Sequence, residues 1–131
     1  MELPPCVEEF TRYYQVPQVL VESIYEVEAG WPGAKVGPNK HGDFTLGVMQ
    51  VNSLWFDEKI GSDLKRYGIT PEQVQHDPCT NFAMSIWLLR EQYRRTGDWS
   101  RAVAQLHAGP RRWKEAIQHA HDVFRRLEQR Q

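Results

Sequence analysis

The stretch from Glu28 to Asn52 constrains the fold most, because it interrupts a chain that otherwise has the pattern of consecutive helices. On both sides of it, apolar residues recur three or four positions apart, which is the spacing of one helix face. The stretch itself begins with a loop rich in Gly, Pro and Asn and then returns to the apolar segment 47–56. Turn residues at this density predict a loop or a small β-ribbon. We therefore expect a mainly α, compact helical domain with a short loop or β-ribbon segment.

Apolar stripes and boundary residues place the remaining elements. Helices are predicted at about 6–14, 17–30, 62–67, 77–96 and 99–106, and segment 47–56 is expected to be a buried turn running into a short helix. Thr70 and Gln73 have the spacing of a capping box, and Asp98 is expected to cap the helix after it. A basic C-terminal helix is predicted at about 111–131, with an apolar stripe of Trp113, Ile117, Ala120, Phe124 and Leu127. Its opposite face is most simply solvated, and consists of Arg111, Arg112, Lys114, Arg125, Arg126 and Arg130.

Length and charge limit the possible classes of protein. The chain has 131 residues, which suits a single domain at 1–131. A net charge of -1 provides no general attraction to nucleic acid, and no apolar run is long enough to span a membrane. The N-terminus lacks the basic and apolar regions of a signal peptide. Taken literally this means a cytoplasmic protein, and the alternative is a mature exported chain with an added start Met. We expect a monomer.

The two cysteines, Cys6 and Cys79, each precede a predicted helix. They are far apart in sequence and could form one disulfide in an oxidising compartment, which is the interpretation that we favour. Two unrelated free thiols are the alternative.

Glu28 is the residue whose position suggests chemistry. It follows Ile24 by four positions and Val21 by seven, which puts it at the edge of the apolar face of its helix. Burial of a carboxyl disfavours its charged form and raises its pKa, so such a glutamate can act as a general acid near neutral pH. The structural alternative is a partly buried glutamate that caps loop amides or pairs with an arginine.

Other kinds of chemistry lack their residue patterns. His119 and His121 fall on different helix faces, no CxxC pair is present, and no nucleotide-binding or nucleophile motif occurs, so no metal and no cofactor is expected. Amide and hydroxyl side chains accompany Glu28 in the same stretch, namely Asn39, Thr45, Gln50 and Asn52. Such groups suit a polyhydroxylated substrate.

Several motifs in order resemble one enzyme family. They are EAGW at 28–31, GVMQVN at 47–52, DPCTN at 77–81 and AVAQLHAGP at 102–110. Together they resemble the lytic transglycosylases of the soluble-type, lysozyme-like superfamily over about 6–110. The chain is most similar to the small specialised members that accompany type III and type IV secretion, conjugation and pilus systems.

The resemblance implies a lysozyme-like fold and a peptidoglycan substrate. Glu28 would be the single catalytic acid/base, cleaving the bond between N-acetylmuramic acid and N-acetylglucosamine and leaving 1,6-anhydro ends. Thr45, Gln50, Asn52 and His107 would bind substrate, whereas Asp43, Asp57 and Glu58 would be ordinary surface or loop charges. A disulfide between Cys6 and Cys79, periplasmic location, and partners in a secretion, conjugation or pilus apparatus are also implied.

Two departures from the family pattern keep alternatives open. Leu106 replaces the tyrosine of the family motif, and Gly37 replaces a small hydroxyl residue, so two hydroxyl groups are lost. The alternatives are a catalytically weak or inactive peptidoglycan-binding or assembly module and a hydrolytic lysozyme.

Overall fold

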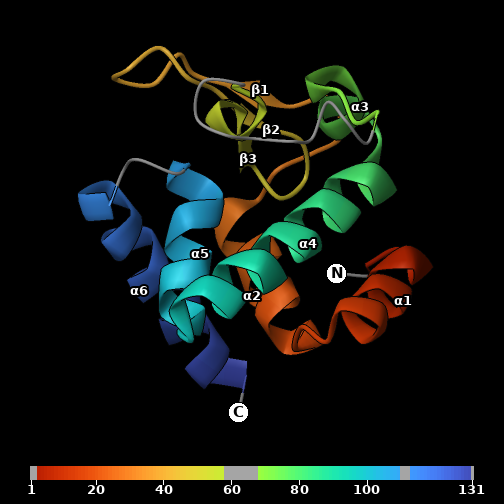
Figure 1. Ribbon diagram of the computed structural model, residues 1–131, viewed down its shortest axis with the longest axis vertical. Coiled ribbons are helices and arrows are strands. Elements are labelled where there is room, and N and C mark those ends of the chain that lie inside the picture. Colours follow the sequence, from red (N-terminus) through yellow and green to blue (C-terminus); the bar gives the residue numbers. More distant parts are fainter. Residues whose placement is uncertain (1–2, 58–67, 110–112, 131) are drawn as a thin grey trace.

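Helices form most of the molecule, and a small sheet lies at one end of it (Figure 1). The computed structural model describes residues 3–57, 68–109 and 113–130. Side chains are described throughout these ranges except at 113–120 and 130. The helices are α1 Pro5–Tyr14, α2 Gln18–Glu28, α3 Pro71–His76, α4 Pro78–Thr96, α5 Trp99–Ala108 and α6 Trp113–Arg130, with a 3-10 helix η1 at Ser53–Phe56. The predicted helix at 62–67 lies outside the described residues.

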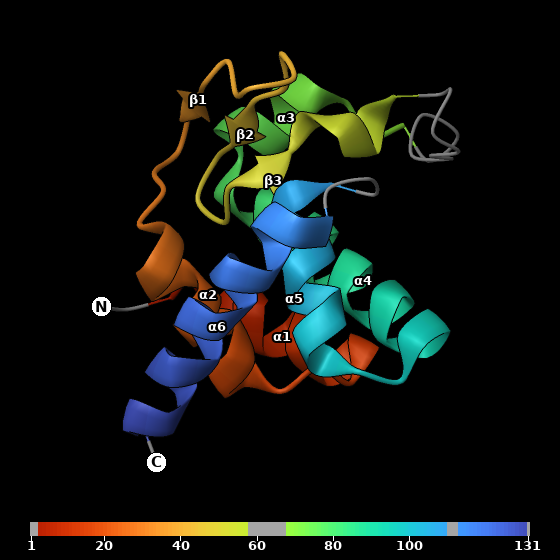
Figure 2. The same ribbon diagram turned by 90° about the vertical axis from the view of Figure 1, so that its left-hand side faces the viewer.

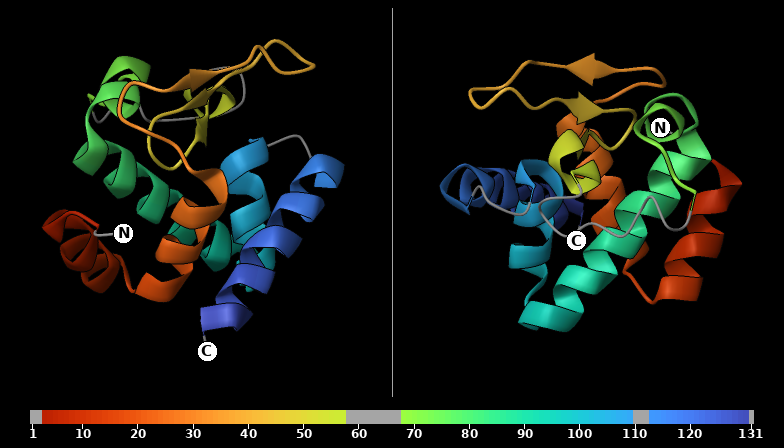
Figure 3. Two further views of the ribbon diagram at one scale, coloured as in Figure 1. Left: turned by 180° about the vertical axis from the view of Figure 1, so that it is seen from behind. Right: turned by 45° about the horizontal axis from the view of Figure 1, so that its top comes forward.

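The predicted ribbon is a three-stranded antiparallel sheet. Its strands are β1 Lys35–Val36, β2 Thr45–Leu46 and β3 Val51–Asn52, in the order β1-β2-β3. The register pairs Thr45 with both Val36 and Asn52. Figures 2 and 3 show this sheet and α3 above one end of the helical part. The prediction of a mainly helical domain with a short ribbon is therefore confirmed.

Helix ends follow the capping residues that the sequence indicates. Thr70 accepts a hydrogen bond from the Gln73 amide, and the Gln73 side chain accepts one from the Thr70 amide, which completes a capping box before α3. Asp98 caps α5 by accepting from the Ser100 amide. Gly97 ends α4 in the left-handed conformation, with φ at 68°.

The hydrophobic core lies between α2, α4 and α5 and extends under the sheet. Ile24, Phe82, Ile86 and Val103 are at most 1% exposed. The C-terminal helix α6 contributes Val123, which is fully buried and which the predicted stripe at 124 and 127 omits. Phe124 and Leu127 are only partly buried, so the described part of α6 is rotated slightly from the expected face.

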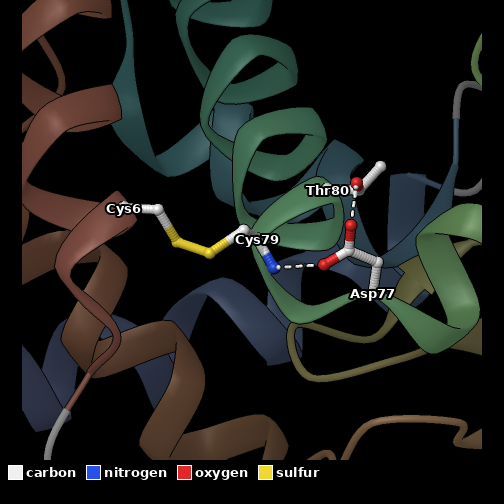
Figure 4. Close-up of a disulfide and its surroundings, with 4 residues drawn as sticks. All are labelled: Cys6, Asp77, Cys79 and Thr80. Carbon is white, nitrogen blue, oxygen red and sulfur yellow. Dashed lines mark hydrogen bonds between the residues drawn. A yellow bond between two sulfur atoms is a disulfide. The ribbon is translucent and has the colours of Figure 1, made fainter.

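A disulfide ties α1 to the start of α4 (Figure 4). Cys6 and Cys79 are bonded, with their Cα atoms 6.0 Å apart, as the resemblance implies. Asp77 caps α4 beside this bridge by accepting hydrogen bonds from the Cys79 amide and the Thr80 hydroxyl. The disulfide and the Asp77 cap therefore both fix the start of α4. This matters for the site because Asn81 follows Cys79 and Thr80 on the same helix.

Candidate active site

The candidate site begins where α2 ends. Glu28 is the last residue of α2, and Ala29 follows in the left-handed conformation with φ at 50°. The Ala29 amide donates to the Tyr25 carbonyl and closes the last turn. The Glu28 side chain is only 7% exposed, so the predicted burial of its carboxyl is confirmed.

Two glycines allow the end of α2 to contact the turn between β2 and β3 backbone to backbone. A Cβ at Gly30 would lie 2.4 Å from the carbonyl oxygen of Gly47 and 2.7 Å from that of Val48. A Cβ at Gly47, where φ is 69°, would lie 2.3 Å from Nδ2 of Asn81. These distances are far below van der Waals contact, so only glycine fits at either position. The EAGW and GVMQVN motifs are thus joined by direct main-chain contact.

The Asn81 side chain holds the turn between β2 and β3 by hydrogen bonds. Its Nδ2 donates to the carbonyls of Leu46 (2.8 Å) and Val74 (2.9 Å), and its Oδ1 accepts from the Met49 amide (3.0 Å). Asn81 is fully buried, and its hydrogen-bonding capacity is used on main-chain groups that would otherwise be unsatisfied. The DPCTN segment therefore positions the turn opposite Glu28.

Thr45 and Gln50 stabilise the same turn from inside. The Thr45 hydroxyl donates to Oε1 of Gln50 (2.5 Å), and Nε2 of Gln50 donates to the Gly47 carbonyl (2.9 Å). Both residues are buried, at 4% and 5% exposure, respectively. The described contacts of Thr45 and Gln50 are thus within the protein, and their role in substrate binding stays a prediction.

His107 is the residue that the structure brings to Glu28. It lies in the last turn of α5, and its Nδ1 is 3.0 Å from Oε2 of Glu28. Its side chain is 34% exposed, but Nδ1 itself is buried, so the contact is shielded and another part of the imidazole reaches solvent. Burial lowers the pKa of His107, but the hydrogen bond to Glu28, the charge of Glu28, a hydrogen bond with the Gln50 backbone and the charge of Asp43 outweigh it. The pKa of His107 is therefore raised above its ordinary value of about 6.5.

Side chains from the sheet region hold the end of α5. Asn52 donates through Nδ2 to the carbonyl of His107 (3.0 Å), and Nε1 of Trp55 donates to the carbonyls of Gln105 (3.1 Å) and Leu106 (3.2 Å). The last carbonyls of a helix have no partner within the helix, so these bonds fix where α5 ends. Asn52 is 1% exposed, and its described hydrogen bonds hold parts of the protein together. Its role as a substrate ligand stays a prediction.

Asp43 corrects one sequence-based expectation. The prediction of an ordinary surface charge is wrong, because Asp43 is 3% exposed. Its Oδ2 accepts hydrogen bonds from Nδ2 of Asn52 (2.7 Å) and Nδ2 of Asn39 (3.1 Å). The local sequence gave no signal of this burial, because Asp43 lies among turn residues that usually face solvent. Asp57 is partly buried, and Glu58 lies outside the described residues.

The structure also places the two residues that depart from the family pattern, Leu106 and Gly37. Leu106 is 1% exposed in the core and supplies no polar group to Glu28. Gly37 adopts φ of 139° before Pro38, a conformation that suits glycine. Trp31, three residues after Glu28, has 57% of its surface exposed, although large apolar side chains are usually covered.

The comparisons with known proteins agree with this geometry. The model of the "Transglycosylase SLT domain" family matches residues 5–127. The chain belongs to this family. Its mainly helical fold with a three-stranded sheet is accordingly lysozyme-like.

Curated relatives cover most of the chain. It is 30% identical to "Protein IpgF" of Shigella flexneri over 123 residues, which is 92% of this chain and 78% of that protein. It is 31% identical over 124 residues to "X polypeptide" of Escherichia coli (strain K12), covering 92% and 70%. It is 27% identical over 104 residues to "Invasion protein IagB" of Salmonella typhimurium (strain SL1344), covering 79% and 62%.

The described residues include no helix long and apolar enough to cross a membrane. Among these residues, no three His, Cys, Asp or Glu side chains gather where a metal ion could be held. The acid/base groups Glu28 and His107 are therefore the clearest chemical feature of the described part of the chain.

Proposed function

We propose that this protein is a peptidoglycan lytic transglycosylase in which Glu28 is the catalytic acid/base. The observation that carries the proposal is the position of the Glu28 carboxyl, which is 7% exposed at the end of α2 and in contact with His107. A carboxyl that is shielded from water and reached from an open edge can hold a proton and deliver it to a bound substrate. Membership of the transglycosylase family supports a glycan substrate.

The proposed reaction uses one carboxyl twice. Glu28 first protonates the glycosidic oxygen between N-acetylmuramic acid and N-acetylglucosamine, and the bond to C1 breaks. The C6 hydroxyl of the muramic residue then attacks C1, and the Glu28 carboxylate takes its proton. The product is a 1,6-anhydro end, no water is added, and the proton given to the glycosidic oxygen is replaced by the proton of the C6 hydroxyl. The usual glycosidase scheme needs two carboxyl groups, whereas this cycle closes with one.

The surroundings of Glu28 fit this substrate. Trp31 exposes an indole close to Glu28 in sequence, and such a flat apolar face suits stacking on a sugar ring. The Cys6–Cys79 disulfide supports action in an oxidising compartment, and we propose the periplasm. There the enzyme would open the cell wall locally for a secretion, conjugation or pilus apparatus, as the family resemblance implies.

The test is mass spectrometry of the muropeptides released from purified peptidoglycan by the parent protein, Glu28→Gln and Glu26→Gln. Glu26 is the matched control, because it lies on the same helix but pairs with Arg126 of α6. We expect anhydro-muramyl products from the parent and from Glu26→Gln, and none from Glu28→Gln. Undiminished digestion by Glu28→Gln would refute the assignment of this residue.

Two other outcomes would identify different functions. Hydrated reducing ends would keep Glu28 as the acid but make the protein a lysozyme. Peptidoglycan binding without any product would favour the binding or assembly module, a candidate that the loss of a hydroxyl at Leu106 supports.

A further inference from the structure

The contact between His107 and Glu28 indicates a role for His107 other than substrate binding. Nδ1 of His107 lies 3.0 Å from Oε2 of Glu28, whereas the resemblance places His107 among the substrate ligands. A side chain that binds the catalytic carboxyl directly can affect where the proton resides. The question is whether the surroundings of His107 favour such a role.

The main chain around His107 is held firmly. Asn52 binds the His107 carbonyl at 3.0 Å and, through the same amide nitrogen, Oδ2 of Asp43 at 2.7 Å. The two Trp55 hydrogen bonds hold the carbonyls of the two preceding residues. The imidazole is therefore presented to Glu28 from a fixed helix end, and the geometry of the pair does not depend on a mobile side chain alone.

The charges around the imidazole favour its protonated form. Among the described residues, the charged groups that act on it are Glu28 from α2 and Asp43 from the loop before β2, and both are acidic. The backbone of Gln50, in the turn between β2 and β3, also hydrogen-bonds to it. A cation at the C-terminal end of α5 is further stabilised by the helix dipole. These effects outweigh burial, and the pKa of His107 is raised.

We propose that His107 is a positioning residue that shares one proton with Glu28 and, as imidazolium, holds the Glu28 carboxylate in the resting enzyme. Asp43 supports the pair with its negative charge and, through Asn52, with hydrogen bonds. This inference rests on the proposed function of Glu28 and extends it.

The proton balance of the cycle is complete. At rest the pair holds one proton, as imidazolium and carboxylate. That proton moves from Nδ1 of His107 to the carboxyl of Glu28 and on to the glycosidic oxygen, which leaves neutral imidazole beside carboxylate. The proton of the attacking C6 hydroxyl then passes to the Glu28 carboxylate and on to Nδ1 of His107, which restores the resting pair. No other acid, base or oxidant is needed.

This proposal predicts a specific change in pH dependence for His107→Asn. The parent should lose kcat/KM as the pH rises through the raised pKa of His107, because the pair then loses its only proton. In His107→Asn the carboxyl alone must hold the proton, and a glutamate releases its proton at lower pH than an imidazolium. The alkaline limb should therefore move to lower pH by about one unit or more. We also expect kcat to fall about 10- to 100-fold with KM changed less than about twofold.

The matched control is His121→Asn, which removes an exposed histidine of α6 and should leave the whole profile unchanged. Rates are measured from anhydro-muropeptides released from soluble glycan strands. An unmoved alkaline limb in His107→Asn would overturn the proposal, and a raised KM with normal kcat would return His107 to substrate binding.

A second measurement keeps the proposal testable if His107→Asn does not fold. The His107 imidazole is titrated by NMR in the parent, in Glu28→Gln and in Asp43→Asn. Removing either negative charge should lower the pH of the His107 midpoint, with the larger shift in Glu28→Gln, because Glu28 makes the direct contact. An unchanged midpoint in Glu28→Gln would overturn the pairing.

The two proposals fail in different ways. If Glu28→Gln is inactive but the profile of His107→Asn is unmoved, the proton-sharing role is wrong and the proposed function stands. If Glu28→Gln is active, the proposed function is wrong, and the NMR titration still reports whether the two side chains are paired.

Discussion

Two polar clusters hold the backbone between Leu46 and Asn52, and they are built in opposite ways. The first is centred on Asn81, a neutral, fully buried amide whose hydrogen bonds go to main-chain groups. The second consists of Glu28, His107 and Asp43, which are ionisable side chains at an edge where the imidazole is 34% exposed. The amide of the first cluster does not titrate, whereas the three side chains of the second cluster can gain or lose protons.

The difference shows how stability and chemistry are divided in this site. A buried neutral amide with all its partners satisfied gives a rigid turn without charge burial. Ionisable groups placed together in a largely buried position cost more to bury but can have their protonation tuned by each other. We therefore expect variants of the first cluster to lower stability and variants of the second to lower activity.

The largest expected effect is on activity in Glu28→Gln. Loss of a general acid should reduce kcat by about 10³-fold or more, equivalent to about 4 kcal/mol in the barrier. The free energy of unfolding, measured in urea, should change by less than about 1 kcal/mol, because glutamine has the same shape and can accept the His107 hydrogen bond. A loss of stability comparable to the loss of activity would break the comparison.

The next largest effect is on stability. It concerns the disulfide at Cys79, two residues before Asn81 of the first cluster. Cys6 and Cys79 are separated by 73 positions, so replacing both by serine should destabilise the fold by about 4 kcal/mol in the chain-entropy model. Urea denaturation of the double variant, beside the parent with and without reductant, measures this cost. At a temperature where the variant remains folded, kcat should stay within about threefold of the parent, since Glu28 and His107 are untouched. A selective loss of kcat would show that the two clusters are coupled.

Asn81→Ala tests the first cluster directly. It removes the partners of two carbonyls and one amide inside the protein, which should cost about 3 kcal/mol. The matched control is Asn39→Ala, which removes an exposed asparagine with one side-chain hydrogen bond, to Oδ2 of Asp43, and should cost less than about 1 kcal/mol. Both are measured by urea denaturation. Equal costs would show that the buried hydrogen bonds of Asn81 do not carry the stability of the turn.

The smallest expected effect is a pH dependence of stability from His107. Its pKa is raised by folding, so its contribution is fully present below the unfolded value of about 6.5 and is lost as the pH rises through the folded value. Unfolding free energies of the parent and His107→Asn should therefore differ more at pH 5 than at pH 9. A difference that grows towards high pH would contradict the sign of the shift.

The sequence by itself determined most of the helices and predicted Glu28 as the acid. Apolar spacing and capping residues such as Asp98 are local signals, and they defined α1, α2, α4 and α5 closely. Glu28 was found from its place on a helix face, which is also a local property. The ordered motifs were sufficient to indicate the family that the comparison establishes.

Only the tertiary structure decided what surrounds Glu28. His107 is far from it in sequence, and the buried Asp43 is linked to the end of α5 through Asn52, which donates to both Asp43 and the His107 carbonyl. Val123 was missed for the same reason, since its burial depends on how α6 packs on the other helices. The spacing of residues along a chain reveals which face of an element they share, but the partner across a contact is set by packing between elements. The sequence therefore predicted Glu28 as the acid, whereas its contact with His107 was decided by the tertiary structure.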